Sequence, residues 1–145
     1  MPALWPADRA RRAEARAVSA EMHSGFMALR KGFPMDVRAA LPDHPRDAEI
    51  EADIARIVAI WEGCRARFAA DGPFLFGAFS IADAMYAPVV WRFHVYNVPL
   101  PPVAAAYRDA MLAHPAMQEW YAAGIRETEA HAHYDRLADD YGGAR

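Results

Sequence analysis

One stretch, residues 77–93 (GAFSIADAMYAPVVWRF), limits what this chain can fold into, because it reads as a helix that is apolar on nearly every side. Ser80 and Asp83 have the spacing of a capping box, in which each side chain accepts from the other residue's backbone N–H, with Asp in place of Glu. The helix is therefore expected to begin at residue 81. Its only acidic or basic side chains are Asp83, Arg92 and His94. A helix without a polar face must be buried on all sides.

Four amphipathic segments surround this helix in the sequence and can cover it. They span residues 8–31, about 47–71, 102–114 and about 115–125, and their ends carry Asp, Pro and Gly stop signals. Pro88 is expected to kink the central helix, since proline removes a backbone donor. No segment has the alternation of a strand. The sequence predicts an all-α, orthogonal bundle of five or more helices around a buried central helix.

Composition excludes several classes of protein. The chain has 145 residues, about one domain, and its longest apolar run, residues 84–91, is far too short to span a bilayer. With no signal peptide at the N-terminus, the chain is expected to be cytoplasmic. The net charge is −3, and the arginines at residues 9–16 are spread around a helix that also carries Asp8 and Glu14, which favours a solvated face over nucleic-acid binding. The single Cys64 lies on an apolar helix face and is expected in the core.

Motifs that carry chemistry are mostly absent. The sequence has no nucleophile elbow, phosphate loop, zinc-protease motif or dinucleotide fingerprint. His131 and His133 are only two residues apart in a polar tail, which favours a mobile tail over a metal site. Asp83 is interpreted as a structural cap with Ser80 and not as an acid–base group. No catalytic or metal-binding residue is therefore predicted.

Several short motifs together resemble the C-terminal, all-helical domain of the glutathione S-transferase family, whose central helix opens with a similar F-[ST]-x-A-D box. They are Leu4-Trp5-Pro6, EMHSGF at 21–26, PMDVR at 34–38, FLFGAFSIAD at 74–83 and HPAMQEW at 114–120. Their order and spacing resemble the bacterial, zeta-like members, the group that includes maleylacetoacetate isomerases. The resemblance implies a helical domain over residues 1–128 and a polar, frayed tail over residues 129–145.

The same resemblance implies that half of an enzyme is missing from this sequence. In the family, a thioredoxin-like domain comes first, binds glutathione and supplies the Ser, Tyr or Cys that activates its thiol. Nothing in this sequence matches that domain. The chain is therefore expected to bind no cofactor alone and to be inactive alone, with glutathione as co-substrate once the missing domain is supplied. Its expected partners are a thioredoxin-like domain or a second copy of the chain, without nucleic acid or membrane.

In the family, the helix and loop that correspond to residues 21–38 wall the pocket for the electrophilic substrate. Met22, His23, Phe26 and Met27 would form a soft apolar wall here, and Arg38 would suit a carboxylate-bearing substrate. Arg92 and Tyr96, with His94, are expected to close the other side. A structural interpretation stays open, because Met and Phe at helical spacing usually lie in a core, and His23 can hydrogen-bond within an interdomain contact.

Two functions from different classes follow. The first is the substrate-binding half of a glutathione S-transferase-like transferase or isomerase, which binds a small hydrophobic or carboxylate-bearing electrophile. The second is a non-catalytic helical module for protein interaction. The fold itself does not decide between them.

Overall fold

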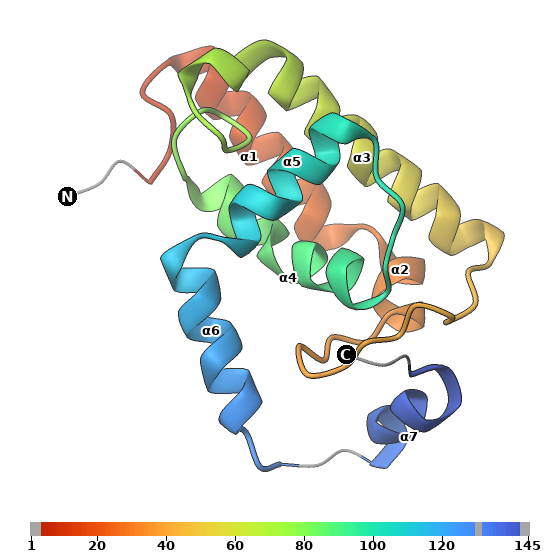
Figure 1. Cartoon of the computed structure of the whole chain (residues 1–145). Helices are drawn as coiled ribbons and strands as arrows, with labels where there is room; N and C mark the ends of the chain where they lie inside the picture. Colours follow the sequence, from red (N-terminus) through yellow and green to blue (C-terminus); the bar gives the residue numbers. More distant parts are fainter. Residues whose placement is uncertain (1–3, 130–131, 143–145) are drawn as a thin grey trace.

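The computed structural model describes residues 4–129 and 132–142, and every regular element in these ranges is a helix (Figure 1). The helices are α1 (Arg9–Ser24), α2 (Met27–Gly32), α3 (Ala48–Phe68), α4 (Ile81–Val95), α5 (Pro102–Leu112), α6 (Pro115–Arg126) and α7 (Ala132–Tyr141), with one 3-10 turn at Ala69–Asp71. The predicted all-α bundle of five or more helices is confirmed.

Helix α4 is the buried centre of the bundle, as its apolar sequence predicts. It packs against α1 on one side and α5 on another, while α3 packs against α2 and α5. Buried side chains point from α4 in several directions, among them Ala82, Tyr86, Val89, Val90 and Phe93. Pro88 lies inside α4, and the helix continues through it to Val95. The lack of a polar face is therefore explained by neighbours on more than one side.

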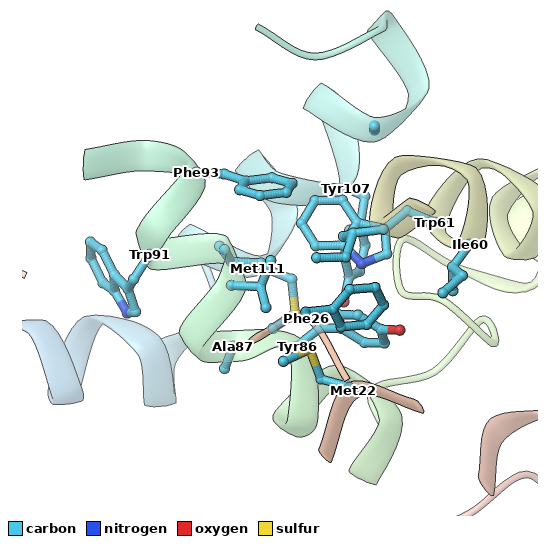
Figure 2. Packing of buried hydrophobic residues seen from close by; sticks show 14 of the residues in the cluster. Met22, Phe26, Ile60, Trp61, Tyr86, Ala87, Trp91, Phe93, Tyr107 and Met111 are labelled. Atoms are coloured by element: carbon cyan, nitrogen blue, oxygen red, sulfur yellow. The ribbon is translucent and has the colours of Figure 1, made fainter. Parts of the chain in front are cut away.

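The core joins α3, α4 and α5 through aromatic rings (Figure 2). Trp61 of α3 is fully buried, and its ring centroid lies 4.8 Å from Tyr107, 5.2 Å from Phe93 and 5.9 Å from Tyr86. Buried residues of α3 also include Ile50, Ile54 and Ile57. Cys64 is buried beside them, as expected, and burial raises the pKa of its thiol to about 11.

The helix expected over residues 8–31 is broken, which corrects that expectation. Helix α1 ends at Ser24, and α2 begins at Met27. Between them Phe26 is left-handed, with φ 59° and ψ 43°, and its ring is 7% exposed. A bulky residue in this conformation costs roughly 1–3 kcal/mol, and burying a phenylalanine side chain contributes about 1.5–3 kcal/mol in return. The break therefore turns the Phe26 ring into the core.

Helix α6 leads away from the rest of the bundle (Figure 1). One side contact comes from Trp91 of α4, which stacks on Tyr121 with 5.2 Å between ring centroids. Figure 2 shows Trp91 well apart from the group around Trp61. A second contact is closer: a Cβ at Gly124 would lie 2.5 Å from the Cγ2 atom of Val37. The glycine therefore lets the loop that follows α2 approach α6.

The segment expected to be a frayed tail contains helix α7. Leu137 and Tyr141 of this helix are partly buried against the core, and the Tyr141 ring lies 4.8 Å from the ring of His44. These apolar contacts give a physical reason for a helix there. The domain division at residue 128 stays a prediction. His131 and the side chain of His133, which were weighed as metal ligands, lie outside the described residues.

Candidate functional site

The entry to α4 holds a buried carboxylate whose partners are all donors. The two hydrogen bonds of a capping box are present between Ser80 and Asp83. Asp83 is 0% exposed and accepts from the N–H of Ser80 at 2.9 Å, the N–H of Leu75 at 2.9 Å, the hydroxyl of Ser80 at 3.0 Å and the hydroxyl of Tyr107 at 3.2 Å. Burial raises the pKa of Asp83, and the four donors lower it part of the way back.

This arrangement is structural. Asp83 joins the loop before α4 to the first turn of α4 and to α5, and no side of its carboxylate faces solvent. A carboxylate acting as general acid or base must reach a substrate proton. The geometry at Asp83 therefore favours a structural cap over an acid–base group.

The residues predicted as a substrate wall divide between the core and the surface. Met22 is 3% exposed and Phe26 7% exposed, so both lie in the core, as the structural interpretation held. His23 is exposed at the end of α1, and Met27, at the start of α2, is 54% exposed. The break between α1 and α2 thus turns Phe26 inward and leaves His23 and Met27 at the surface.

The sequence reasoning did not single out Arg30 of α2, although this residue lies at the break between α1 and α2. Its Nη2 atom donates to the carbonyl oxygens of Met22, at 2.6 Å, and His23, at 3.2 Å. Both carbonyls belong to the last turn of α1, where carbonyls lack partners within the helix and the helix dipole favours a cation. The Nε atom of Arg30 is buried and has no hydrogen-bond partner among the described residues. This contact is possible only because the helix breaks after Ser24. The expectation of a continuous helix over residues 8–31 therefore did not include it.

Arg92 and Tyr96, near the end of α4, hold the segment that follows α2. The Nε atom of Arg92 donates to the carbonyl of Phe33 at 2.7 Å, and its Nη1 atom donates to the carbonyl of Pro88 at 3.3 Å. Burial lowers the pKa of Arg92, and the nearby positive charge of Arg30 lowers it further. The hydroxyl of Tyr96 donates to the carbonyl of Pro34 at 2.9 Å.

Tyr96 itself is closed off from solvent. Its ring is 1% exposed and stacks on Phe33, with 4.0 Å between centroids and 1° between planes. Burial raises the pKa of its hydroxyl above the ordinary value for tyrosine. Direct contact between Tyr96 and a ligand would need the stacked ring of Phe33 to move, so its evident task is to position residues 33 and 34.

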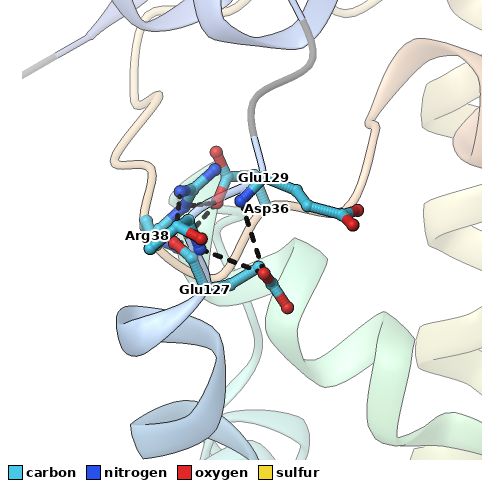
Figure 3. A network of polar contacts seen from close by, with 5 residues as sticks. Asp36, Arg38, Glu127 and Glu129 are labelled. Carbon is cyan, nitrogen blue, oxygen red and sulfur yellow. Dashed lines mark hydrogen bonds and ion pairs between the residues drawn. The ribbon is translucent and has the colours of Figure 1, made fainter.

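Arg38 lies in a separate polar network, between Asp36 and the end of α6 (Figure 3). The Oδ1 atom of Asp36 accepts from the backbone N–H of Arg38 at 2.8 Å and from its Nε atom at 3.4 Å. The Nη1 atom of Arg38 donates to the carbonyl of Glu127 at 3.2 Å. The carboxylate of Glu127 accepts in turn from the N–H groups of Thr128 and Glu129. Arg38 thus ties the loop after α2 to the end of α6.

We define the α2–α4 band as a set of residues at the end of α1, on α2, in the loop after α2 and at the end of α4: His23, Met27, Arg30, Asp36, Arg38, Arg92 and Tyr96. Tyr96 is its fully buried member. Arg30 is bonded to the end of α1 and acts electrostatically on Arg92. The pKa of Tyr96 responds to Arg92 and to Asp36, which pairs with Arg38. The sequence motifs at 21–26 and 34–38 therefore meet the end of α4 in space.

Other parts of the described surface carry different features. One hollow of about 480 Å³ is lined by Trp5, Phe79 and neighbours at the start of α1, and one of about 360 Å³ is lined by His94, Asn97 and Arg108 with others. A third, of about 180 Å³, lies over Cys64 between α1 and α3. None of these three includes a residue of the α2–α4 band. Among the described residues no three potential metal ligands gather, and no helix is long and apolar enough to cross a membrane.

Comparison with known proteins bears on the family. The family model described as "Glutathione S-transferase, C-terminal domain" matches residues 47–123, which is more than half of the chain and includes α3, α4 and α5. Among solved structures, a similar chain is a glutathione transferase homologue from Burkholderia gl BGR1 with bound glutathione, at 24% identity and a TM-score of 0.60. The match covers 86% of this chain and 57% of that one, so this chain spans little more than half the length of the homologue. No curated protein matches the sequence. The matched model shows that the chain belongs to the glutathione S-transferase C-terminal domain family.

Proposed function

We propose that this chain is the substrate-binding half of a glutathione S-transferase-like transferase or isomerase of the zeta-like group, and that its α2–α4 band holds the electrophile. The observation that carries the proposal is the turn between α1 and α2, which leaves His23 and Met27 exposed at the place where Arg30 donates to the carbonyl of His23. An apolar side chain next to charged donors suits a small molecule with an apolar body and a polar group.

Each residue has a distinct part in this proposal. Met27 contacts the apolar body of the electrophile, and His23 lies at the rim. Met22 and Phe26 form the floor beneath them, since both are buried. Tyr96 and Arg92 fix Phe33 and Pro34 and so shape the wall opposite. Arg38 holds the loop against the end of α6.

Glutathione enters this scheme as a co-substrate. Conjugation requires a thiolate, so a donor must lie against the sulfur to lower the pKa of its thiol. In the described part of the α2–α4 band the only hydroxyl is that of Tyr96, which is buried and donates to Pro34. A separate thioredoxin-like domain would supply the thiolate, and this chain would orient the electrophile for attack. The chain alone is therefore expected to show no conjugation of glutathione in a spectrophotometric assay.

Chemical-shift mapping with cinnamamide, a neutral aromatic compound with an electrophilic double bond, tests the proposed surface. The proposal expects perturbations at residues 23–30 and 92. Met27→Ala should weaken binding several-fold, because the substitution removes apolar contact area from the ligand site. The core should not be disturbed, since Met27 is exposed. Val103→Ala is the matched control, since Val103 is 47% exposed and lies on α5, which carries no residue of the band. Shifts confined to α5 or α6, or equal effects of the two variants, would reject the band as the substrate site.

A second candidate, a non-catalytic interaction module, is favoured by α6. Trp120 and Ile125 of this helix are 37% and 43% exposed, and exposed large apolar side chains on one helix are common at protein contacts. If this candidate holds, sedimentation of the chain shows self-association that Trp120→Ala removes, while cinnamamide leaves the spectrum of the band unchanged. The two proposals are therefore separated by which surface responds.

A further inference from the structure

The largest of the three hollows lies between the N-terminal segment and the loop before α4, and it takes no part in the proposed function. Its volume of about 480 Å³ lies within the range of small-molecule sites in proteins. Its lining is both aromatic and charged. The aromatic residues are Trp5, Phe76 and Phe79, and the charged ones are Asp8, Arg11 and Asp71.

Separate contacts hold the N-terminal wall of this hollow in place. The carbonyl of Leu4 accepts from the backbone N–H of Ile81 at 3.0 Å, so the N-terminal segment is tied to the first turn of α4 (Figure 1). The Nη1 atom of Arg12 donates to the carbonyls of Pro6 at 2.9 Å and Ala7 at 2.7 Å. A wall that is fixed before a ligand arrives lowers the entropy cost of binding.

The opposite wall is the loop before α4, and a glycine brings it close. Gly77 has a φ of 94°, and a Cβ there would lie 2.7 Å from the Cβ atom of Asp71. The close approach of the loop to the end of the 3-10 turn therefore requires glycine at this position. On the same loop, Phe79 stacks on His114 with 4.3 Å between ring centroids and 20° between planes. The Phe79 ring is thus held in position at the hollow.

The charged lining offers acceptors to a ligand. The Oδ1 atom of Asp8 accepts from the backbone N–H of Arg11, and the Oδ2 atom of Asp71 accepts from the Nη1 atom of Arg11, both at 2.7 Å. Within the part of the chain that the structure describes, the second oxygen of each carboxylate accepts no hydrogen bond. The positive N-terminal ends of α1 and α4 need no anion from outside, because Asp8 and Asp83 already cap them. The hollow therefore favours a ligand that donates hydrogen bonds.

We infer that this hollow binds an aromatic amine, with its ring among Trp5, Phe76 and Phe79 and its ammonium group at the carboxylates of Asp8 and Asp71. A cation is attracted to the face of an aromatic ring, most strongly to that of tryptophan. Hydrogen bonds from an ammonium group to a carboxylate are also stronger than those between neutral groups. The inference goes beyond the proposed function, because the hollow shares no residue with the α2–α4 band.

The test compares three indole ligands of similar size by chemical-shift titration of the 145-residue chain at neutral pH and low salt. Tryptamine is a cation, indole-3-acetamide is neutral and indole-3-acetate is an anion. Tryptamine should bind about fivefold more tightly than indole-3-acetamide, and indole-3-acetate should bind most weakly. The perturbed signals should belong to residues 5–8 and 76–80, with the indole N–H of Trp5 among them. Added salt should reduce the preference for tryptamine.

Two substitutions change the charge of the lining in opposite directions. Asp71→Asn removes one carboxylate and leaves Arg11 without its ion pair, so tryptamine should bind about fivefold more weakly. Arg11→Gln removes the competing cation, so tryptamine should bind about threefold more tightly. Both side chains are partly exposed, and circular dichroism checks that each variant is folded. Neither substitution should change the affinity for indole-3-acetamide by more than about twofold.

Asp109→Asn is the matched control. Asp109 is also an exposed aspartate paired with an arginine, but it lies on α5, which contributes nothing to the hollow. Its substitution lowers the negative charge of the chain by the same amount and should leave the affinity for tryptamine nearly unchanged. If Asp71→Asn is not folded, the tighter binding expected for Arg11→Gln decides the matter.

Four results would overturn the inference. They are an absence of tryptamine binding, equal affinities for the three ligands, perturbations confined to the α2–α4 band or to α5 and α6, and equal effects of Asp71→Asn and Asp109→Asn. The last result would mean that tryptamine responds only to the net charge of the chain. All four leave the proposed function standing, because cinnamamide tests a different set of residues.

Discussion

The entry to α4 and the α2–α4 band are both rich in polar groups, yet the hydrogen-bond partners of these groups differ between the two regions. At the entry, one buried carboxylate accepts from four donors on three residues, so the charged group is enclosed by the protein. In the band, two arginines donate to backbone carbonyls, and the Nε atom of Arg30 has no partner within the part of the chain that the structure describes. A polar cluster that is complete within the chain stabilises the fold. A polar cluster whose charge is left uncompensated is where we expect a ligand or a partner domain to bind.

Removing the carboxylate at the α4 entry should produce the largest effect on stability. Asp83→Ala leaves the N–H groups of Leu75 and Ser80 and the hydroxyl of Tyr107 buried without their acceptor, which we expect to cost about 4 kcal/mol. Urea denaturation followed by circular dichroism measures the free energy of unfolding. Asp47→Ala, at the exposed N-cap of α3, is the control and should cost only about 1 kcal/mol. Similar losses for the two variants would mean that the buried network adds nothing to an ordinary cap.

The cap hydroxyl should matter less than the carboxylate. Ser80→Ala is expected to cost about 1 kcal/mol, because Asp83 keeps its two backbone donors and the hydroxyl of Tyr107 when the Ser80 hydroxyl is lost. Ser80→Thr keeps a hydroxyl and should recover most of that loss. Equal urea midpoints for Ser80→Ala and the parent chain would count against the capping role.

In the band, loss of a charge should have little effect on folding. Arg30→Gln gives up contacts with two carbonyls at the end of α1, worth roughly 0.3–1 kcal/mol, and relieves the repulsion with Arg92. We therefore expect the free energy of unfolding to change by less than about 1 kcal/mol, of either sign. The same urea experiment measures it. A loss comparable to that of Asp83→Ala would place Arg30 in the structural class and remove the contrast between the two regions.

The smallest expected effect is the pH dependence that Asp83 contributes. Burial raises its pKa above the ordinary value of 3.8, so the folded chain holds the proton more tightly than the unfolded chain does. The resulting stabilisation is fully present below pH 3.8 and is lost as the pH rises through the folded-state pKa. Asp83→Asn cannot titrate, so the stability advantage of the parent over this variant should shrink from about pH 3 to about pH 7. A stability advantage of the parent that grows over this pH range would contradict the raised pKa of Asp83. The variant Asp47→Asn controls for the loss of one negative charge.

The sequence predicted the entry to α4 better than the band, and the reason is local spacing. Ser80 and Asp83 are three residues apart, so their contact follows from helix geometry alone. The donors from Leu75 and Tyr107 depend on tertiary packing and were not foreseen. The central position of α4 was foreseen, because a helix apolar on all sides has few alternatives.

The band could not be predicted from the sequence, because it depends on the backbone conformation of one residue. The pattern of residues 8–31 is continuous for a helix, and nothing local in it requires Phe26 to become left-handed. The burial of the Phe26 ring, a property of the whole core, overrides the helical preference of these residues. Once the helix breaks, Arg30 meets the last carbonyls of α1. Met22 and Phe26 then belong to the core, whereas Met27 is 54% exposed.

The bond from Arg38 to Glu127 joins positions 89 residues apart and closes most of the chain into a ring. Helix α6 extends beyond the bundle, so by itself it would be a natural unit for local opening and fast amide exchange. Its far end, however, is held by the loop that follows α2. Opening α6 from that end must therefore release residues 36–38 as well, and the amides of both segments should exchange with solvent at correlated rates. A contact at the surface would in this way couple the exchange behaviour of the first and last thirds of the fold.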